Sequence, residues 1–175
     1  MPILPPDYRY CPHCATQLST RVEEERLRQY CPNCRWKYYP VPATAVAGVC
    51  VRLDQVLMAQ RGREPFLGTW MFPAGFVEFG ENPSEALARE FMEESGLIVL
   101  KTSLVDILQS HDDPRSPNHF VIFYLAEAAG EIRNVDVDEN KGLRWFSITD
   151  PPEIGFPTHQ QIMKRLQTGE LRWTT

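Results

Sequence analysis

Short runs rich in β-branched and aromatic residues predict most of the secondary structure of this chain. The expected strands are 44–52, 55–60, 70–72, 102–110, 119–128 and 143–146. Helical spacing of apolar residues predicts helices at 83–95 and 159–167. Because helices and antiparallel hairpins are interspersed, an α+β fold or a layered α/β sandwich fits this order better than a doubly wound fold.

The helix at 83–95 is specified by the residues at its ends. Asn82 can cap its first turn, Pro83 suits the first helical position, and Glu85 can reach back to the cap amide. Gly96 suits the left-handed conformation that often ends a helix. The limits of this helix are therefore expected to be well defined.

Three glutamates share one side of this helix. With Glu90 at zero on a helical wheel, Glu94 falls at about 40° and Glu93 at about 300°. The face expected to be buried lies beside them and carries Leu87, Ala88, Phe91 and Met92. The acidic residues should therefore run along the edge of the core.

A divalent cation would neutralise this acidic side better than its one flanking arginine, Arg89. Like charges at this spacing repel each other, and one guanidinium cannot compensate three carboxylates. Oxygen-only ligands suit Mg²⁺ or Mn²⁺, which complete their coordination with water and substrate phosphates. Phosphate chemistry is therefore indicated, with an acidic, solvated helix face as the alternative.

Four of the five cysteines form two C-x2-C pairs, Cys11 with Cys14 and Cys31 with Cys34. This spacing is typical of structural zinc, and the Tyr-Cys-Pro repeated at each pair suggests two equivalent turns, as in zinc ribbons. Two disulfides or a catalytic dithiol are the alternatives. Cys50 lies in an apolar run and is expected to be buried.

A zinc ribbon is expected at residues 1–40, followed by a second domain at 41–175. Residues 17–30, between the cysteine pairs, should form a hairpin, with a charged helix as the alternative. Residues 1–40 carry six basic and four acidic side chains, so the ribbon has a net charge of +2 and the remainder −7. This small positive charge favours a solvated surface over a nucleic-acid interface, which stays an alternative.

The composition is that of a globular chain. Of the 175 residues, 43% are hydrophobic and 23% are charged, which allows a sizeable core. No apolar run approaches the roughly 20 residues of a membrane-spanning helix. The proline-rich N-terminus lacks the cationic start and apolar stretch of a secretory signal, so a cytoplasmic location without membrane contact is expected.

The most specific pattern lies at 75–97. It reads Gly75, five residues, Glu81, seven residues, and then REFMEESGL from Arg89 to Leu97. This segment resembles the Nudix box, G-x5-E-x7-R-E-U-x-E-E-x-G-U with U apolar, at every specified position. Flanking segments also resemble this family, so the likeness covers residues 43–165.

The resemblance implies a Nudix α/β/α sandwich with a mixed sheet behind the ribbon. The ligands that it implies for Mg²⁺ or Mn²⁺ are Glu90, Glu93, Glu94 and the carbonyl oxygen of Gly75. It also implies that Arg89 and Glu81 form a supporting ion pair. The implied reaction is attack of water on one phosphorus of a nucleoside diphosphate linked to another group, and enzymes of this kind often form homodimers.

The general base differs among members of this family. It is Glu90 or an acidic residue of a later segment, where Glu139 is preferred to Asp136 and Asp138. The candidate substrate contacts are Phe66, which could stack on an aromatic ring, Arg61 and His111. Trp70 and Trp145, in strand-like runs, are expected to belong to the core.

A zinc ribbon ahead of a Nudix domain resembles two groups of enzymes. NADH pyrophosphatases, which also decap NAD-linked RNA, carry S-Q-P-W-P-F-P-x-S after the box, whereas residues 108–119 here read LQSHDDPRSPNH. A shorter class acts on FAD or ADP-ribose. The expected substrate is therefore ADP-ribose or FAD, cleaved to release AMP, with NADH or NAD-capped RNA as the alternative.

An alternative of another class is a non-catalytic module that senses nucleotides or associates with RNA. Degenerate modules of that kind commonly lose glutamates of the box. Every glutamate of the box is present here. The sequence therefore favours an enzyme.

Overall fold

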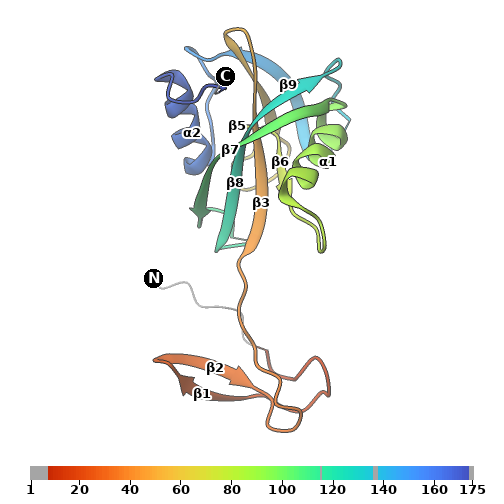
Figure 1. Ribbon diagram of the computed structural model, residues 1–175, viewed down its shortest axis with the longest axis vertical. Helices are drawn as coiled ribbons and strands as arrows, with labels where there is room; N and C mark the ends of the chain where they lie inside the picture. Colours follow the sequence, from red (N-terminus) through yellow and green to blue (C-terminus); the bar gives the residue numbers. More distant parts are fainter. Residues whose placement is uncertain (1–7, 115, 136–137, 174–175) are drawn as a thin grey trace. The chain divides into compact units, whose positions relative to one another are not determined.

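The computed structural model describes residues 8–114, 116–135 and 138–173, which fall into two compact units within Met1–Pro42 and Ala43–Thr175 (Figure 1). The first unit contains an antiparallel hairpin of β1 (Ser19–Glu23) and β2 (Arg26–Tyr30). Its two-residue turn has positive φ angles at both residues, as tight hairpin turns require. The predicted hairpin is confirmed, and the alternative of a helix is wrong.

The second unit is built around a mixed sheet. Its strands are β3 (Ala43–Arg52), β4 (Gln55–Arg61), β5 (Trp70–Met71), β6 (Ala74–Phe76), β7 (Ile98–Ser110), β8 (His119–Ala129) and β9 (Asn140–Ser147). Neighbouring strands follow the order β5-β4-β3-β8-β7, while β6 pairs with β3 and β9 with β4. The β3–β8 pair is parallel, and the other named pairs are antiparallel.

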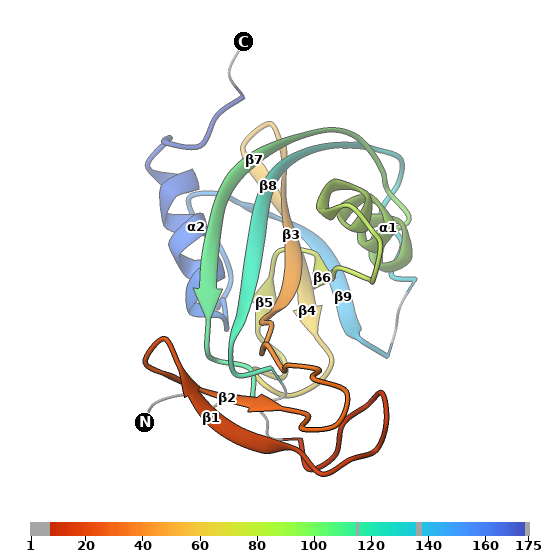
Figure 2. The ribbon, with the colours of Figure 1, turned by 60° about the horizontal axis from the view of Figure 1, so that its bottom comes forward.

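Two helices, α1 (Pro83–Ser95) and α2 (Pro157–Gln167), flank this sheet on opposite sides (Figures 1 and 2). Each helix packs into its own apolar cluster. Leu87 of α1 belongs to one cluster, and Ile162 and Leu166 of α2 belong to the other. This arrangement confirms the predicted α/β/α sandwich.

The ends of α1 are those that the sequence predicts. The side chain of Asn82 accepts a hydrogen bond from the backbone N–H of Ser84, and Glu85 accepts one from the N–H of Asn82 at 3.2 Å. Gly96 is left-handed, with φ of 71°. The expectation for Met92 is wrong, because this side chain is 45% exposed while Glu94 lies on the buried side of the helix.

The remaining differences concern short elements and strand ends. β7 begins at Ile98, ahead of the expected 102–110, because its first residues pair with the end of β8. β6 was not expected, since three residues that include a glycine carry no strand pattern. Trp70, Trp145 and Cys50 pack into the clusters of the sheet, as predicted. The helices of the described chain are too short and polar to cross a membrane.

Candidate functional site

Arg89 ties α1 to the segment between β6 and the helix. Its guanidinium donates two hydrogen bonds to Glu81, at 2.9 and 3.0 Å, and one to the carbonyl oxygen of Phe76 at 2.9 Å. The pairing lowers the pKa of Glu81 and raises that of Arg89. Arg89 also reaches Glu90 at 2.8 Å and Glu93 at 2.9 Å. One side chain therefore orients three carboxylates.

Glu90 packs against the backbone of β6. Gly75 lies opposite Val46 in the β6–β3 ladder, and a Cβ atom at Gly75 would overlap the carboxylate of Glu90. Only glycine leaves room for the acid here. Burial raises the pKa of Glu90, and the hydrogen bond from Arg89 opposes this shift.

Glu94 is the most deeply buried carboxylate of the site, at 2% exposed. Its oxygens accept hydrogen bonds from the N–H of Ala74 at 3.2 Å and from Nδ2 of Asn140 at 2.8 Å. Burial, together with the charges of Glu90 and Glu139, raises the pKa of Glu94 to about 8 although the bond from Asn140 lowers it. The site thus crowds carboxyl groups in a poorly solvated place, which disfavours their charged forms.

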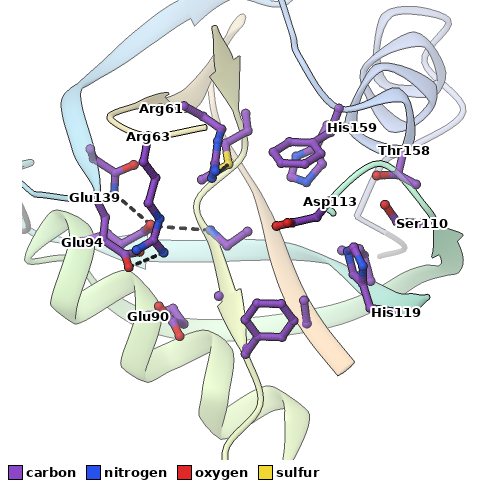
Figure 3. A pocket seen from close by; sticks show the side chains of 18 of the residues that line it. Arg61, Arg63, Glu90, Glu94, Ser110, Asp113, His119, Glu139, Thr158 and His159 are labelled. Atoms are coloured by element: carbon purple, nitrogen blue, oxygen red, sulfur yellow. Dashed lines mark hydrogen bonds and ion pairs between the residues drawn. The ribbon is translucent and has the colours of Figure 1, made fainter. Parts of the chain in front are cut away.

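These carboxylates open onto a cavity of about 290 Å³. Figure 3 shows Glu90, Glu94 and Glu139 on one side of it and a second polar group on the other. The residues of that second group are Ser110, Asp113, His119, Thr158 and His159. We call the first the acidic side and the second the hydroxyl side.

The acidic side fits a divalent cation. Its candidate ligand atoms are carboxylate and amide oxygens, which Mg²⁺ and Mn²⁺ prefer. Asn140 lines the cavity and donates to Glu94, and its Oδ1 is buried without a hydrogen-bond partner among the described residues. Burial, and secondarily neighbouring carboxylates, raises the pKa values of Glu90 and Glu94, and a bound cation would stabilise their charged forms. The ligands that the sequence predicts all line this cavity and stay a prediction, namely Glu90, Glu93, Glu94 and the carbonyl group of Gly75.

Glu139 lines the same cavity and forms an ion pair with Arg63, which also lines it. The backbone carbonyl of Glu139 accepts a hydrogen bond from the N–H of Gly62 at 2.7 Å. This bond joins the segment before β9 to the end of β4. Of the other candidate bases, Asp138 is not among the lining residues, and Asp136 lies outside the described residues.

The three predicted substrate contacts have different surroundings. Arg61 lines the cavity, and its guanidinium carbon lies 5.0 Å from the centre of the Phe156 ring. Phe66 is not in the lining and packs edge-on against Phe156, at 4.7 Å between ring centres. His111 is exposed and also outside the lining, whereas His119 at the far end of the same loop is buried and lines the cavity.

Sequence reasoning missed several lining residues, namely Arg63, Ser110, Asp113, Asn140, Thr158 and His159. Each stands near the end of a strand or the start of a helix. Polar residues at such junctions are a weak signal by themselves. They meet because the last residues of β4 and β7 and the first residues of β8, β9 and α2 surround one cavity. Predicting this requires the order of the strands in the sheet.

The four ribbon cysteines form a second candidate metal site. They are free, and their sulfur atoms all lie within 4.8 Å of one another. Cys11 and Cys34 are 3.5 Å apart at Sγ, as are Cys14 and Cys31. The disulfide alternative is therefore wrong, and this arrangement of sulfurs fits a tetrahedral zinc ion.

The two cysteine turns repeat the same backbone geometry, as the sequence predicts. Ala15 N–H donates to the carbonyl of Cys11 at 2.9 Å, and Arg35 N–H donates to that of Cys31 at 3.0 Å. Ala15 and Arg35 both have positive φ angles, of 56° and 64°. Two equivalent turns thus present four thiol groups to one point.

A mixed sandwich whose capped, glutamate-bearing helix borders a polar cavity defines a hydrolase of the Nudix type. The chain belongs to the NUDIX domain family, whose model matches residues 41–166. The resemblance on the box residues is thereby confirmed.

Two relatives bear on the substrate. An ADP-ribose pyrophosphatase of Methanocaldococcus jannaschii is 35% identical over 140 residues, which cover 79% of each chain. A NAD-capped RNA hydrolase NudC of Photorhabdus laumondii is 32% identical over 160 residues, which cover 91% of this chain. The chain spans 58% of the length of that second relative.

Solved structures agree on the fold. A NUDIX hydrolase from Nitrosomonas europaea has a TM-score of 0.75 at 23% identity, covering 92% of this chain and 91% of its own. A MutT NUDIX hydrolase from Burkholderia pseudomallei has a TM-score of 0.67 at 27% identity, covering 72% and 98%. At 23% identity, the likeness to the Nitrosomonas europaea protein shows the fold alone.

Proposed function

We propose that this protein hydrolyses the pyrophosphate bond of ADP-ribose and releases AMP, with Mg²⁺ or Mn²⁺ as the cofactor. The observation that carries the proposal is the cavity that sets the carboxylates of Glu90 and Glu94 opposite a second polar side. A substrate whose diphosphate links two polar groups matches a cavity with two polar sides. The relative named ADP-ribose pyrophosphatase supports this substrate.

In this proposal Glu90, Glu93, Glu94 and the Gly75 carbonyl group hold the cation. When bound, such an ion lowers the pKa of a coordinated water and offsets negative charge on phosphate oxygens. Arg89 and Glu81 support the glutamates and do not transfer protons. The hydrogen bonds that Arg89 donates to both Glu81 and the Phe76 carbonyl suit this role, because they fix the helix to the β6 segment.

Glu139 is the proposed general base. It lines the cavity next to Glu94. In this proposal Arg63 leaves its ion pair with Glu139 and pairs with a substrate phosphate instead. Arg61 adds a second positive charge on the same cavity. Phe66 acts indirectly in this proposal, by holding the Phe156 ring that lies under the Arg61 guanidinium.

NAD-linked substrates, including NAD-capped RNA, form the second candidate. The observation that favours them is the match to a NAD-capped RNA hydrolase over 91% of this chain. The ribbon is proposed to bind zinc as a structural ion. FAD turnover, homodimer formation and a cytoplasmic location stay predictions.

A substrate panel tests the proposal. Purified protein with Mg²⁺ is incubated with ADP-ribose, FAD, NADH and NAD-capped RNA, and AMP or a related monophosphate is measured by chromatography. We expect AMP from ADP-ribose at the highest rate, and a loss of at least about a hundredfold in Glu94→Gln. Ser147→Ala, at an exposed hydroxyl on β9, is the control and should keep full activity. No release from any substrate would contradict the proposal.

A further inference from the structure

The hydroxyl side of the cavity carries polar atoms that the proposed cation site does not use. Ser110 is 1% exposed and Thr158 is 7% exposed. The hydroxyl oxygens of both are buried and have no hydrogen-bond partner among the described residues. Because buried hydroxyls are nearly always hydrogen-bonded in folded proteins, two such groups on one cavity indicate a ligand that completes their bonding.

Two strands and a helix hold three of these four groups in place. Ser110, the last residue of β7, is the cross-strand partner of His119, the first residue of β8. Thr158 lies in the first turn of α2, and Asp113 lies in the segment that joins the two strands. Figure 3 shows these four side chains on the side of the pocket away from Glu90. Ser110, His119 and Thr158 are therefore positioned by regular secondary structure.

The hydroxyl side offers mainly acceptors. Nδ1 of His119 lies 2.8 Å from the carbonyl oxygen of Ser116, which can only accept, so Nδ1 donates this hydrogen bond. The carboxylate of Asp113 accepts only, and the two hydroxyls both donate and accept. A matching ligand must therefore donate hydrogen bonds as well as accept them.

This requirement selects among the parts of a nucleotide. A phosphate group accepts but does not donate at neutral pH, so it cannot satisfy the acceptors of this side. A nucleobase binds mainly through its flat face, for which the same cavity offers Phe76 and Phe156, whereas the buried hydroxyls and the carboxylate call for a partner rich in hydroxyl groups. Vicinal sugar hydroxyls donate and accept, and a carboxylate is a common partner for them.

We propose that Ser110, Asp113, His119 and Thr158 form a subsite for the vicinal hydroxyls of a ribose. This inference rests on the proposed function and names the part of the substrate that the hydroxyl side recognises. Binding there directs the adjoining diphosphate toward Glu90 and Glu94 across the cavity. ADP-ribose contains two riboses, one in the adenosine and one at the other end, and both carry this chemistry.

The first test removes single hydroxyl groups from the protein. Thr158→Val and Ser110→Ala change little volume, and each should raise the KM for ADP-ribose by about tenfold through loss of one hydrogen bond. Their melting temperatures should not fall, because the deleted hydroxyls have no partner in the described protein. Ser147→Ala, which removes an exposed hydroxyl at 3.0 Å from that of Thr149, should change neither quantity.

The second test removes hydroxyls from the substrate. KM is measured for ADP-ribose, for its analogue deoxygenated in the adenosine ribose, and for its analogue deoxygenated in the terminal ribose. The penalty of Thr158→Val or Ser110→Ala should vanish for one analogue and persist for the other, which identifies the ribose in the subsite. Equal penalties for all three substrates, or none, would overturn the proposal.

A third measurement separates this inference from the proposed function. Calorimetry on the cation-free protein follows ADP-ribose binding without turnover. Hydroxyl-dependent binding to the cation-free protein, together with no AMP release after Mg²⁺ is added, would refute the proposed function and support the subsite. Hydrolysis of ADP-ribose with the same KM in wild type and both variants would support the function and refute the subsite.

Discussion

At the scale of the residue, His159 shows how burial sets the charge of a cavity wall. The side chain is 4% exposed, and its Nδ1 accepts a hydrogen bond from the N–H of Phe72 at 3.1 Å. Burial, and secondarily the charges of Arg61 and His119, lowers the pKa of His159 to about 3. The ring is therefore neutral in the folded protein at neutral pH.

This shift predicts a loss of stability in acid. Between pH 6.5 and about 3 the unfolded chain binds a proton at His159 that the folded chain does not, so the free energy of unfolding falls as the pH falls through this window. The contribution is at most about 1.4 kcal/mol per pH unit. His159→Asn removes this pH dependence. In denaturant titrations the variant should therefore be less stable than wild type by a larger margin at pH 7 than at pH 4.

The control for packing is Ile162→Val, a buried change on the same helix without a titratable group. Its deficit should be the same at pH 7 and pH 4. If the stability difference between His159→Asn and wild type is also the same at pH 7 and pH 4, the imidazole ring is not held neutral in the folded protein.

At the scale of the element, α1 could be predicted from sequence because its determinants are local. The cap, the proline, the terminal glycine and the glutamate spacing all lie within 82–96. The partners of Glu94 could not be predicted in this way. Ala74 lies in β6, and Asn140 begins β9, 46 residues away along the chain. Only the assembled sheet brings them to the helix.

The close approach of β6 to α1 gives a prediction for Gly75→Ala. The added methyl group would overlap the carboxylate of Glu90, whose flexible end can turn aside. We therefore expect a folded protein in which Glu90 is displaced, with at least about tenfold lower hydrolysis rates and weaker activation by Mg²⁺. Steady-state rates over a Mg²⁺ titration check this.

Gly142→Ala is the matched control for that variant. Gly142 lies in β9, and a Cβ atom there would meet no neighbour within 4 Å. This change should gain about 0.5–1 kcal/mol of stability and leave Mg²⁺ activation unchanged. Equal activation in Gly75→Ala and wild type would show that the Gly75–Glu90 contact does not matter for the cation site.

At the scale of the whole molecule, the layers of the fold can be predicted from the strand and helix patterns of the sequence, but the residues that meet in the cavity cannot. The sequence predicts the sandwich and most strands. It does not predict that the loop ending at His119 and the first turn of α2 meet, because the parallel β3–β8 pairing and the crossing to α2 are non-local. For that reason sequence reasoning selects His111 as a substrate contact, whereas His119 lines the cavity.

The two units have separate sources of stability. Both apolar clusters consist of residues from Ala45 onward, whereas the ribbon has a short hairpin and four cysteines at one point. A unit of this size with so small a core usually depends on its metal for folding. Loss of zinc should therefore unfold the ribbon and leave the sandwich folded.

Replacing Cys11 and Cys31 together with serine tests this in the full chain. Elemental analysis should find one zinc ion per wild-type chain and none in the variant. Hydrogen exchange should show lost protection at Ser19–Tyr30 and unchanged protection in α1, α2 and the sheet, since local units open independently when they share no core. Zinc retained at one ion per chain would place it elsewhere, and exchange throughout β3–β9 would show that the sandwich depends on the ribbon.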